Sequence, residues 1–144
     1  MATHPFGFGI VIPHGLTSGF SIITKQHKYQ EMNWTALTSE KQINKIIEKS
    51  KSVPCLIFKH SLTCPISSMA KHRVEGKWDF AEGEIDAYYL DLLNYRSVSN
   101  AVAEIFGVQH QSPQVLLIQD GMCVFDTSHL DITVEGIRSN LQVA

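Results

Sequence analysis

Cys64 is the side chain of this 144-residue chain best suited to covalent chemistry, and it lies in the segment FKHSLTCPIS. Pro65 follows it directly at the expected start of a helix, and Ser67 stands three residues on. The free amides and the positive dipole end of a helix start favour an anion such as a thiolate. We therefore expect Cys64 to be a redox nucleophile, supported by Pro65, Ser67 and, if its ring turns toward the sulfur, His60. The alternative is an inert free cysteine.

Cys64 has no obvious internal partner for a disulfide. In a Cys-x-x-Cys dithiol the second cysteine would occupy the place of Ser67, which either donates a hydrogen bond to the thiolate or is an ordinary helix residue. Cys55 lies at the entry of the strand that leads to Cys64, and Cys123 lies at the far end of a later strand. A disulfide needs Cα atoms within about 7 Å. We expect neither to resolve Cys64, so an external thiol must do so.

The surrounding elements follow from hydrophobic periodicity, capping residues and turn residues. The order is helix, strand, helix, strand, helix, strand, strand, helix. This alternation predicts an α/β sandwich, with a central four-stranded mixed sheet and helices on both faces. The predicted helices span residues 38–50, 65–78, 96–108 and 131–141, and the predicted strands span residues 53–60, 85–92, 113–119 and 122–126.

Particular residues predict where these helices begin and which way they face. Ser39 and Gln42 form a capping-box pair at the start of the first helix. Ile66, Met69, Ala70 and Val74 are expected on the buried face of the helix that follows Cys64. Asp131 is expected to cap the last helix.

Ser112 and Pro113 precede an apolar strand. A proline in this place often marks only the beginning of a strand. A cis bond would instead bring the backbone of Gln111 and Ser112 beside Cys64, where it would offer pairing groups to an extended thiol-bearing ligand. X-Pro bonds are cis in only about 5% of cases, but the order of the elements raises that expectation here.

This order of elements, with Cys-Pro-x-Ser at a helix start and an X-Pro strand in a hairpin, resembles the thioredoxin fold. The segments FKHSLTCPISSMA, DAYYLDL, HQSPQVLLIQDG and SHLDIT further resemble the YtxJ-like monothiol bacilliredoxin family of bacterial stress-response redox proteins, over about residues 32–141. The resemblance implies a thioredoxin-like three-layer sandwich. It also implies Cys64 as the redox-active cysteine, Ser112 and Pro113 as a cis-proline element that contacts the thiol ligand, and bacillithiol as the thiol co-substrate.

The function that the resemblance implies is a monothiol thiol–disulfide oxidoreductase that removes bacillithiol from S-bacillithiolated client proteins, without a bound cofactor or metal. Two alternatives stay open: a non-catalytic thioredoxin-fold binding or redox-sensing module, and a glutaredoxin-like protein that uses another small thiol. Bacillithiol carries carboxylates, for which Lys59 and Lys71 are the nearest basic candidates. His110 and His129 flank the matched segments, and plain surface histidines are the simpler interpretation of both.

Composition narrows the function classes and the compartment. With 12 basic and 14 acidic side chains, interspersed along the chain, there is no electrostatic footprint for nucleic acid or for a membrane surface. Three cysteines are too few and odd in number for a disulfide scaffold, and no Cys/His spacing suits zinc, so we expect a reducing cytoplasm. We interpret residues 1–31 as a flexible extension, with Met32 as an alternative start, and residues 32–144 as the thioredoxin-like domain.

Overall fold

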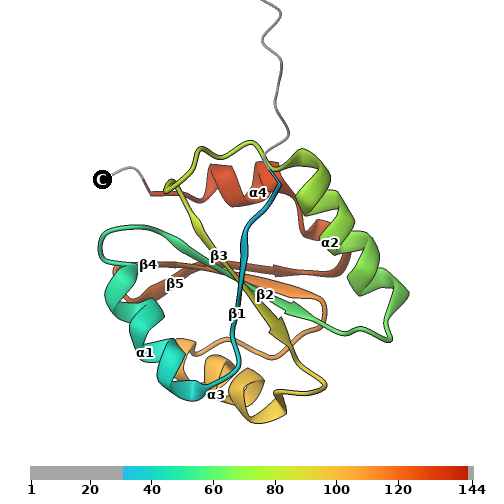
Figure 1. The fold of residues 1–144 in the computed structure, drawn as a ribbon, viewed down its shortest axis with the longest axis horizontal. Coiled ribbons are helices and arrows are strands. Elements are labelled where there is room, and N and C mark those ends of the chain that lie inside the picture. The colour runs from blue at the N-terminus through green and yellow to red at the C-terminus, as the bar shows by residue number, and fades with distance from the viewer. Residues whose placement is uncertain (1–30, 143–144) are drawn as a thin grey trace, which may run out of the picture.

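The computed structural model describes residues 31–142, so the expected extension over residues 1–31 lies almost wholly outside the described residues. A five-stranded sheet lies between two helical layers, with α2 and α4 on one face and α1 and α3 on the other (Figure 1). The elements are β1 (Trp34–Ala36), α1 (Glu40–Lys49), β2 (Cys55–His60), α2 (Pro65–Lys77), β3 (Asp86–Asp91), α3 (Arg96–Phe106), β4 (Gln114–Gln119), β5 (Met122–Ser128), a 3₁₀ turn η1 (His129–Asp131) and α4 (Val134–Ser139).

The strands follow the spatial order β1-β3-β2-β4-β5. β1 and β2 run parallel to β3, whereas β4 is antiparallel to both β2 and β5. The mixed sheet is thus as predicted, except that it has five strands and not four. The missed strand β1 has only three residues, which pair with residues 87–89 of β3. A strand so short has no alternating pattern of its own, because its partner across the sheet defines it.

Local sequence signals predicted the start of α1 correctly and the start of α4 wrongly. Ser39 and Gln42 form the predicted capping box of α1. The last helix begins later than predicted, because Thr133 and not Asp131 is its cap: Thr133 Oγ1 accepts the amide of Gly136 at 3.0 Å. Asp131 instead closes the 3₁₀ turn that precedes α4. Both residue types suit an N-cap, and the packing of η1 against α2 decides between them.

The buried face of α2 agrees with the prediction only in part. Ala70 and Val74 are buried as predicted, whereas Ile66 and Met69 are exposed and Ser67 is buried. The buried residues recur at helical spacing, so a serine takes the place in the core that an isoleucine was expected to take. The exposed apolar side chains lie instead in the first turns of α2, close to Cys64 in the chain.

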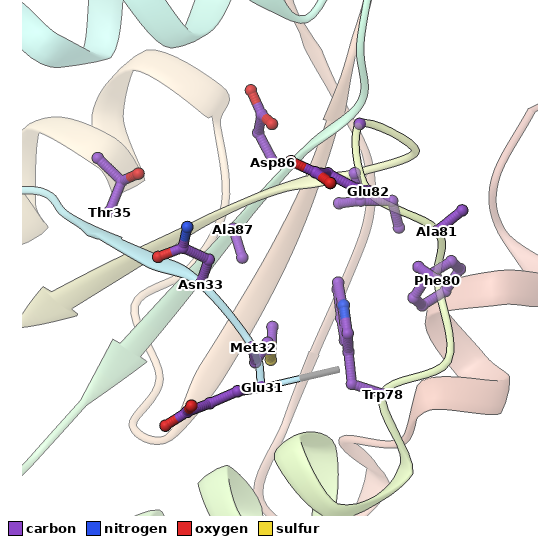
Figure 2. Close-up of a pocket in the computed structure, with 12 residues that line it drawn as sticks. Glu31, Met32, Asn33, Thr35, Trp78, Phe80, Ala81, Glu82, Asp86 and Ala87 are labelled. Atoms are coloured by element: carbon purple, nitrogen blue, oxygen red, sulfur yellow. The ribbon is translucent and has the colours of Figure 1, made fainter. Parts of the chain in front are cut away.

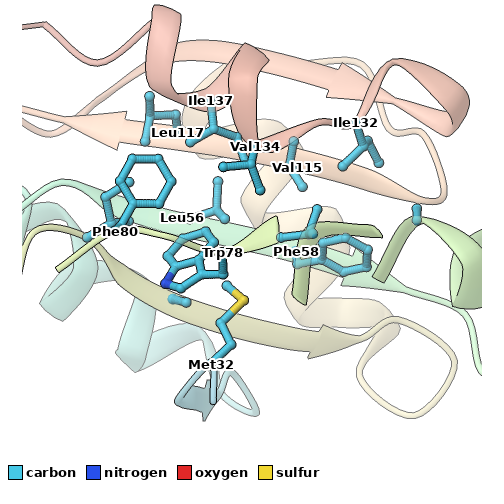
Figure 3. Close-up of a cluster of buried hydrophobic side chains, with 14 residues drawn as sticks. Met32, Leu56, Phe58, Trp78, Phe80, Val115, Leu117, Ile132, Val134 and Ile137 are labelled. Atoms are coloured by element: carbon cyan, nitrogen blue, oxygen red, sulfur yellow. The ribbon is translucent and has the colours of Figure 1, made fainter. Parts of the chain in front are cut away.

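Two hydrophobic clusters pack on opposite faces of the sheet. On the α2 and α4 face, β2 contributes Leu56 and Phe58, which meet Trp78 and Ile137 (Figure 3). On the α1 and α3 face, the alternate β2 residues face the other cluster. Because successive side chains of a strand point to opposite faces, Lys59 points toward α3 while His60 points toward α2. The last two residues of β2 therefore serve opposite sides of the molecule.

Candidate functional site

Cys64 is the N-cap of α2 and is half-buried. Its backbone is extended, with φ −102° and ψ 115°, and its carbonyl accepts the amide of Ser68 at 3.2 Å as the first helical hydrogen bond. The side chain makes no capping hydrogen bond. Pro65 at the first helical position has no N–H, so the first amides of α2 beside the sulfur are those of Ile66 and Ser67. The position suits a nucleophilic thiolate.

Ser67 is fully buried and serves the protein interior. Its Oγ lies 2.7 Å from His60 Nδ1 and accepts the amide of Ser61 at 3.0 Å. Since Ser61 uses the oxygen as an acceptor, the hydroxyl proton is best donated to His60 Nδ1, which places the ring proton on Nε2. No hydrogen bond joins Ser67 to Cys64 among those of the described residues. The hydroxyl is therefore used within the protein interior, a role that neither sequence interpretation of Ser67 included.

His60 is 4% exposed and its ring is turned to Ser67. It packs between the rings of Phe58 and Tyr89, at centroid distances of 6.0 and 5.4 Å. Burial, with a smaller contribution from the charge of Lys71, lowers the pKa of His60. An uncharged imidazole bonded to a buried serine holds the β2–α2 connection in place. The hydrogen bonds of the described residues include none between His60 and the sulfur of Cys64.

The other two cysteines lie at the opposite end of the sheet. Cys55 begins β2, whose far end leads to Cys64, and it pairs with Ile118, which in turn pairs with Cys123. All three thiols are free. Burial raises the pKa of Cys55 to about 12 and that of Cys123 to about 11. Both therefore stay protonated at neutral pH, and neither is placed to form a disulfide with Cys64.

Ser112 and Pro113 lie at the same edge of the sheet as Cys64. The register pairs Lys59 near the end of β2 with Gln114 at the start of β4, so the connections that leave β2 and enter β4 are neighbours. The Ser112–Pro113 peptide bond is cis. The Pro113 carbonyl accepts the amide of His129 at 3.1 Å. Ser112 Oγ is buried and has no hydrogen-bond partner among the described residues.

The two basic candidates lie on opposite sides of the sheet. Lys59 is fully buried on the α3 side, where it cannot contact a ligand bound near Cys64. Burial lowers its pKa to about 8. Lys71 lies on α2 and is paired with Glu75. With His60 and Tyr89 it lines a pocket of about 280 Å³ beside the β2–α2 connection. Of these two lysines, Lys71 alone lines this pocket.

A larger pocket of about 370 Å³ lies away from the cysteine, between β1 and the segment that links α2 to β3 (Figure 2). Glu31, Glu82 and Asp86 line it, together with Trp78. It contains no cysteine and none of the residues predicted for the site. Within residues 31–142, no group of three or more His, Cys, Asp or Glu side chains could hold a metal ion.

Sequence reasoning missed the polar contacts beneath the loop that precedes Pro113. Lys59 Nζ lies 3.3 Å from His110 Nδ1, and the Gln114 side chain bonds to the backbone of Gln109 and Gln111. His110 and His129 are both exposed, as a surface histidine would be. A lysine directly after the apolar run VPCLIF was the available signal, because an uncompensated charge seldom occurs in a buried strand.

Comparison with known proteins adds to this geometry. The family model described as monothiol bacilliredoxin BrxC matches residues 35–137. A solved protein described as an oxidoreductase with a thioredoxin fold is 31% identical, with a TM-score of 0.67 over 78% of this chain and 96% of that one. Thioredoxins of Trypanosoma brucei brucei (12% identical, TM-score 0.60, 78% and 91% covered) and Fasciola hepatica (18%, 0.59, 74% and 98%) share the fold. None of the helices described is long and apolar enough to cross a bilayer.

Proposed function

The chain belongs to the monothiol bacilliredoxin family of thiol redox proteins, and from that premise we propose that it removes bacillithiol from S-bacillithiolated client proteins through Cys64. The observation that carries the proposal is the setting of its thiols. Cys64 is the partly exposed N-cap of α2, whereas Cys55 and Cys123 lie at the other end of the sheet with raised pKa values. We also propose that the protein works in a bacterial cytoplasm that is rich in small thiols.

The proposed reaction consists of two thiol–disulfide exchanges. The Cys64 thiolate attacks the bacillithiol sulfur of the client's mixed disulfide. A new S–S bond forms between Cys64 and bacillithiol, the old S–S bond breaks, and its electron pair leaves with the client cysteine as a thiolate. A second bacillithiol thiolate then attacks the bacillithiol sulfur bound to Cys64. This forms the symmetrical disulfide and returns the Cys64 thiolate, so no net redox equivalent is left on the protein.

The absence of an internal resolver supports the external second step. Ser67 stands where a dithiol protein would have its second cysteine, and its hydroxyl is engaged by His60 and Ser61. The adduct on Cys64 therefore persists until a small thiol arrives. A monothiol cycle of this kind depends on the concentration of free small thiol and not on an intramolecular disulfide.

The surface around Cys64 supports a protein substrate. Leu62, Ile66 and Met69 flank the cysteine in the chain and are exposed by 60%, 44% and 59%. Exposed apolar side chains clustered in this way are typical of surfaces that contact other proteins. We propose that Lys71 attracts the carboxylates of bacillithiol and that Ser112 and Pro113 contact its extended part.

Intact-mass analysis tests the proposal. The purified protein is mixed with a peptide that carries bacillithiol in a mixed disulfide, and a glutathione mixed disulfide is run in parallel. We expect one adduct on Cys64, formed faster with bacillithiol than with glutathione and cleared by free bacillithiol. The adduct should be absent in Cys64→Ser and unchanged in Cys123→Ser. An adduct that is never released would contradict turnover and favour a binding or sensing module. Equal rates with glutathione would contradict the choice of bacillithiol.

A further inference from the structure

Lys59 is a buried cation that the exchange reaction does not use. Its side chain is fully buried at the end of β2, and no carboxylate of the described residues lies within ion-pair distance of its Nζ. Its nearest polar partners are the Ser99 carbonyl of α3 at 3.1 Å and His110 Nδ1 at 3.3 Å. A buried ammonium without a counter-ion is costly, and an apolar residue would fit β2 at a lower cost. The burial of Lys59 therefore needs a reason, and its hydrogen bonds to Ser99 and His110 provide one.

His110 receives this contact from the loop between α3 and β4. A lysine side chain only donates when charged, so Nδ1 must accept and the imidazole must be neutral. Burial, followed by the charges of Lys59 and Arg96, lowers the pKa of His110 and keeps it neutral at pH 7. Ser99 Oγ also lies 3.3 Å from Nδ1. Lys59 and Ser99 thus fix one ring atom of a residue that is otherwise exposed.

Gln114 holds the same loop from the side of β4. It is fully buried and is the register partner of Lys59, so both side chains leave the same face of the sheet. Its Oε1 accepts the Gln111 amide at 3.2 Å, and its Nε2 donates to the Gln109 carbonyl at 2.9 Å and to Asp126 Oδ2 at 3.3 Å. Lys59 and Gln114 therefore hold residues 109–111 through hydrogen bonds, and these residues lead directly to Ser112.

We propose that Lys59 is a positioning residue for the site: by holding His110, it sets the place of the 109–112 backbone against which a thiol-bearing ligand binds beside Cys64. This inference rests on the proposed function. Lys59 does not touch the sulfur in this scheme, and its effect passes through the loop. Removing it should therefore weaken ligand binding and leave the intrinsic reactivity of the Cys64 thiol unchanged.

The test compares Lys59→Met, His110→Ala, their double variant and Lys45→Met, which removes an exposed lysine of α1 as a matched control. Exchange of Cys64 with a peptide–bacillithiol disulfide is measured as a function of disulfide concentration, and alkylation by iodoacetamide reports the thiol alone. We expect the half-saturating concentration to rise about tenfold in each single variant, as for loss of a charge-assisted hydrogen bond. The double variant should rise no further, because both changes remove one contact.

Three kinetic results would overturn the inference. The first is a half-saturating concentration in Lys59→Met that equals the one in Lys45→Met. The second is an alkylation rate in Lys59→Met that falls in step with exchange, which would mean that the charge acts on the sulfur directly. The third is a double variant in which the two single effects multiply. Amide hydrogen exchange at Gln111 provides a readout that does not depend on activity. It should accelerate in Lys59→Met and not in Lys45→Met. If the wild-type protein exchanges with no mixed disulfide, the proposed function fails, while an unchanged Gln111 amide would separately refute the positioning role.

Discussion

Replacing Ser67 with alanine should destabilise the protein without slowing the chemistry of Cys64. The hydroxyl lies 2.7 Å from His60 Nδ1 and accepts the Ser61 amide at 3.0 Å, and both partners are buried. Alanine leaves almost no cavity, so the loss comes from two buried polar groups that lose their partner. A buried group left unpaired costs about 1 to 3 kcal/mol, but local relaxation recovers part of this. We expect a net loss of about 2 kcal/mol.

Urea unfolding measures this loss. With a slope of about 2 kcal/mol per M for a domain of this size, the midpoint should fall by about 1 M, and the Tm should fall by about 8 °C. Ser68→Ala is the matched control, because Ser68 is the neighbouring serine of α2 and its hydroxyl has no hydrogen bond among those described. The Ser68→Ala substitution should change the free energy of unfolding by no more than about 0.5 kcal/mol.

The chemistry of the same variant separates the interior role of Ser67 from the hydrogen bond to the thiolate that the sequence left open. Because the hydroxyl is used by His60 and Ser61, iodoacetamide should alkylate Cys64 in Ser67→Ala at the wild-type rate. If the midpoint matched that of Ser68→Ala while alkylation slowed severalfold, the reasoning would be refuted. The serine would then act on the thiolate and not on the β2–α2 connection.

Three further predictions concern the thiols, the glycines and the buried lysine. Iodoacetamide at pH 8 should label Cys64 in the native protein and label Cys55, whose pKa burial raises to about 12, only after unfolding in urea, as peptide mass mapping would show. Gly107→Ala should cost about 1 kcal/mol because its φ is 65°, whereas Gly76→Ala, where an added Cβ meets nothing within 4 Å, should stabilise α2 by up to about 1 kcal/mol in urea unfolding. Burial lowers the folded-state pKa of Lys59 to about 8 from 10.5, so the unfolded chain binds more protons between these values and stability should rise with pH across that window. A wild-type stability that stays parallel to that of Lys59→Met from pH 8 to 10.5 would contradict this burial.

Local sequence patterns predicted the elements that carry strong signals of their own. The capping box at Ser39, the short apolar run of β2 and Pro65 after Cys64 each depend on neighbours within a few residues, so the chain itself indicates them. β1 was missed because three residues form a strand only against β3. The cap of α4 was misassigned because Asp131 and Thr133 are both suitable N-cap residues in isolation.

The face of α2 could not be obtained from apolarity alone. The sequence indicates Ile66, Met69, Ala70 and Val74 as core residues, but the helix buries Ser67 together with Ala70 and Val74 and leaves Ile66 and Met69 exposed. Ser67 has two buried hydrogen-bond partners in His60 and Ser61 that satisfy its hydroxyl, and these exist only once β2 and α2 are packed. Tertiary contacts thus allowed a polar residue inside and left apolar residues at the surface near Cys64.

By itself, the sequence determined the chemistry available to this protein: one cysteine at a helix start, a serine where a second thiol would stand, and an α/β order that brings the ends of strands to one edge. These depend on residue type and on the covalent order of the chain. Only the tertiary structure decided how Lys59 and His60, adjacent in the chain, are used. Because strand side chains alternate, His60 supports the β2–α2 connection on one face, while Lys59 grips the 109–111 loop on the other.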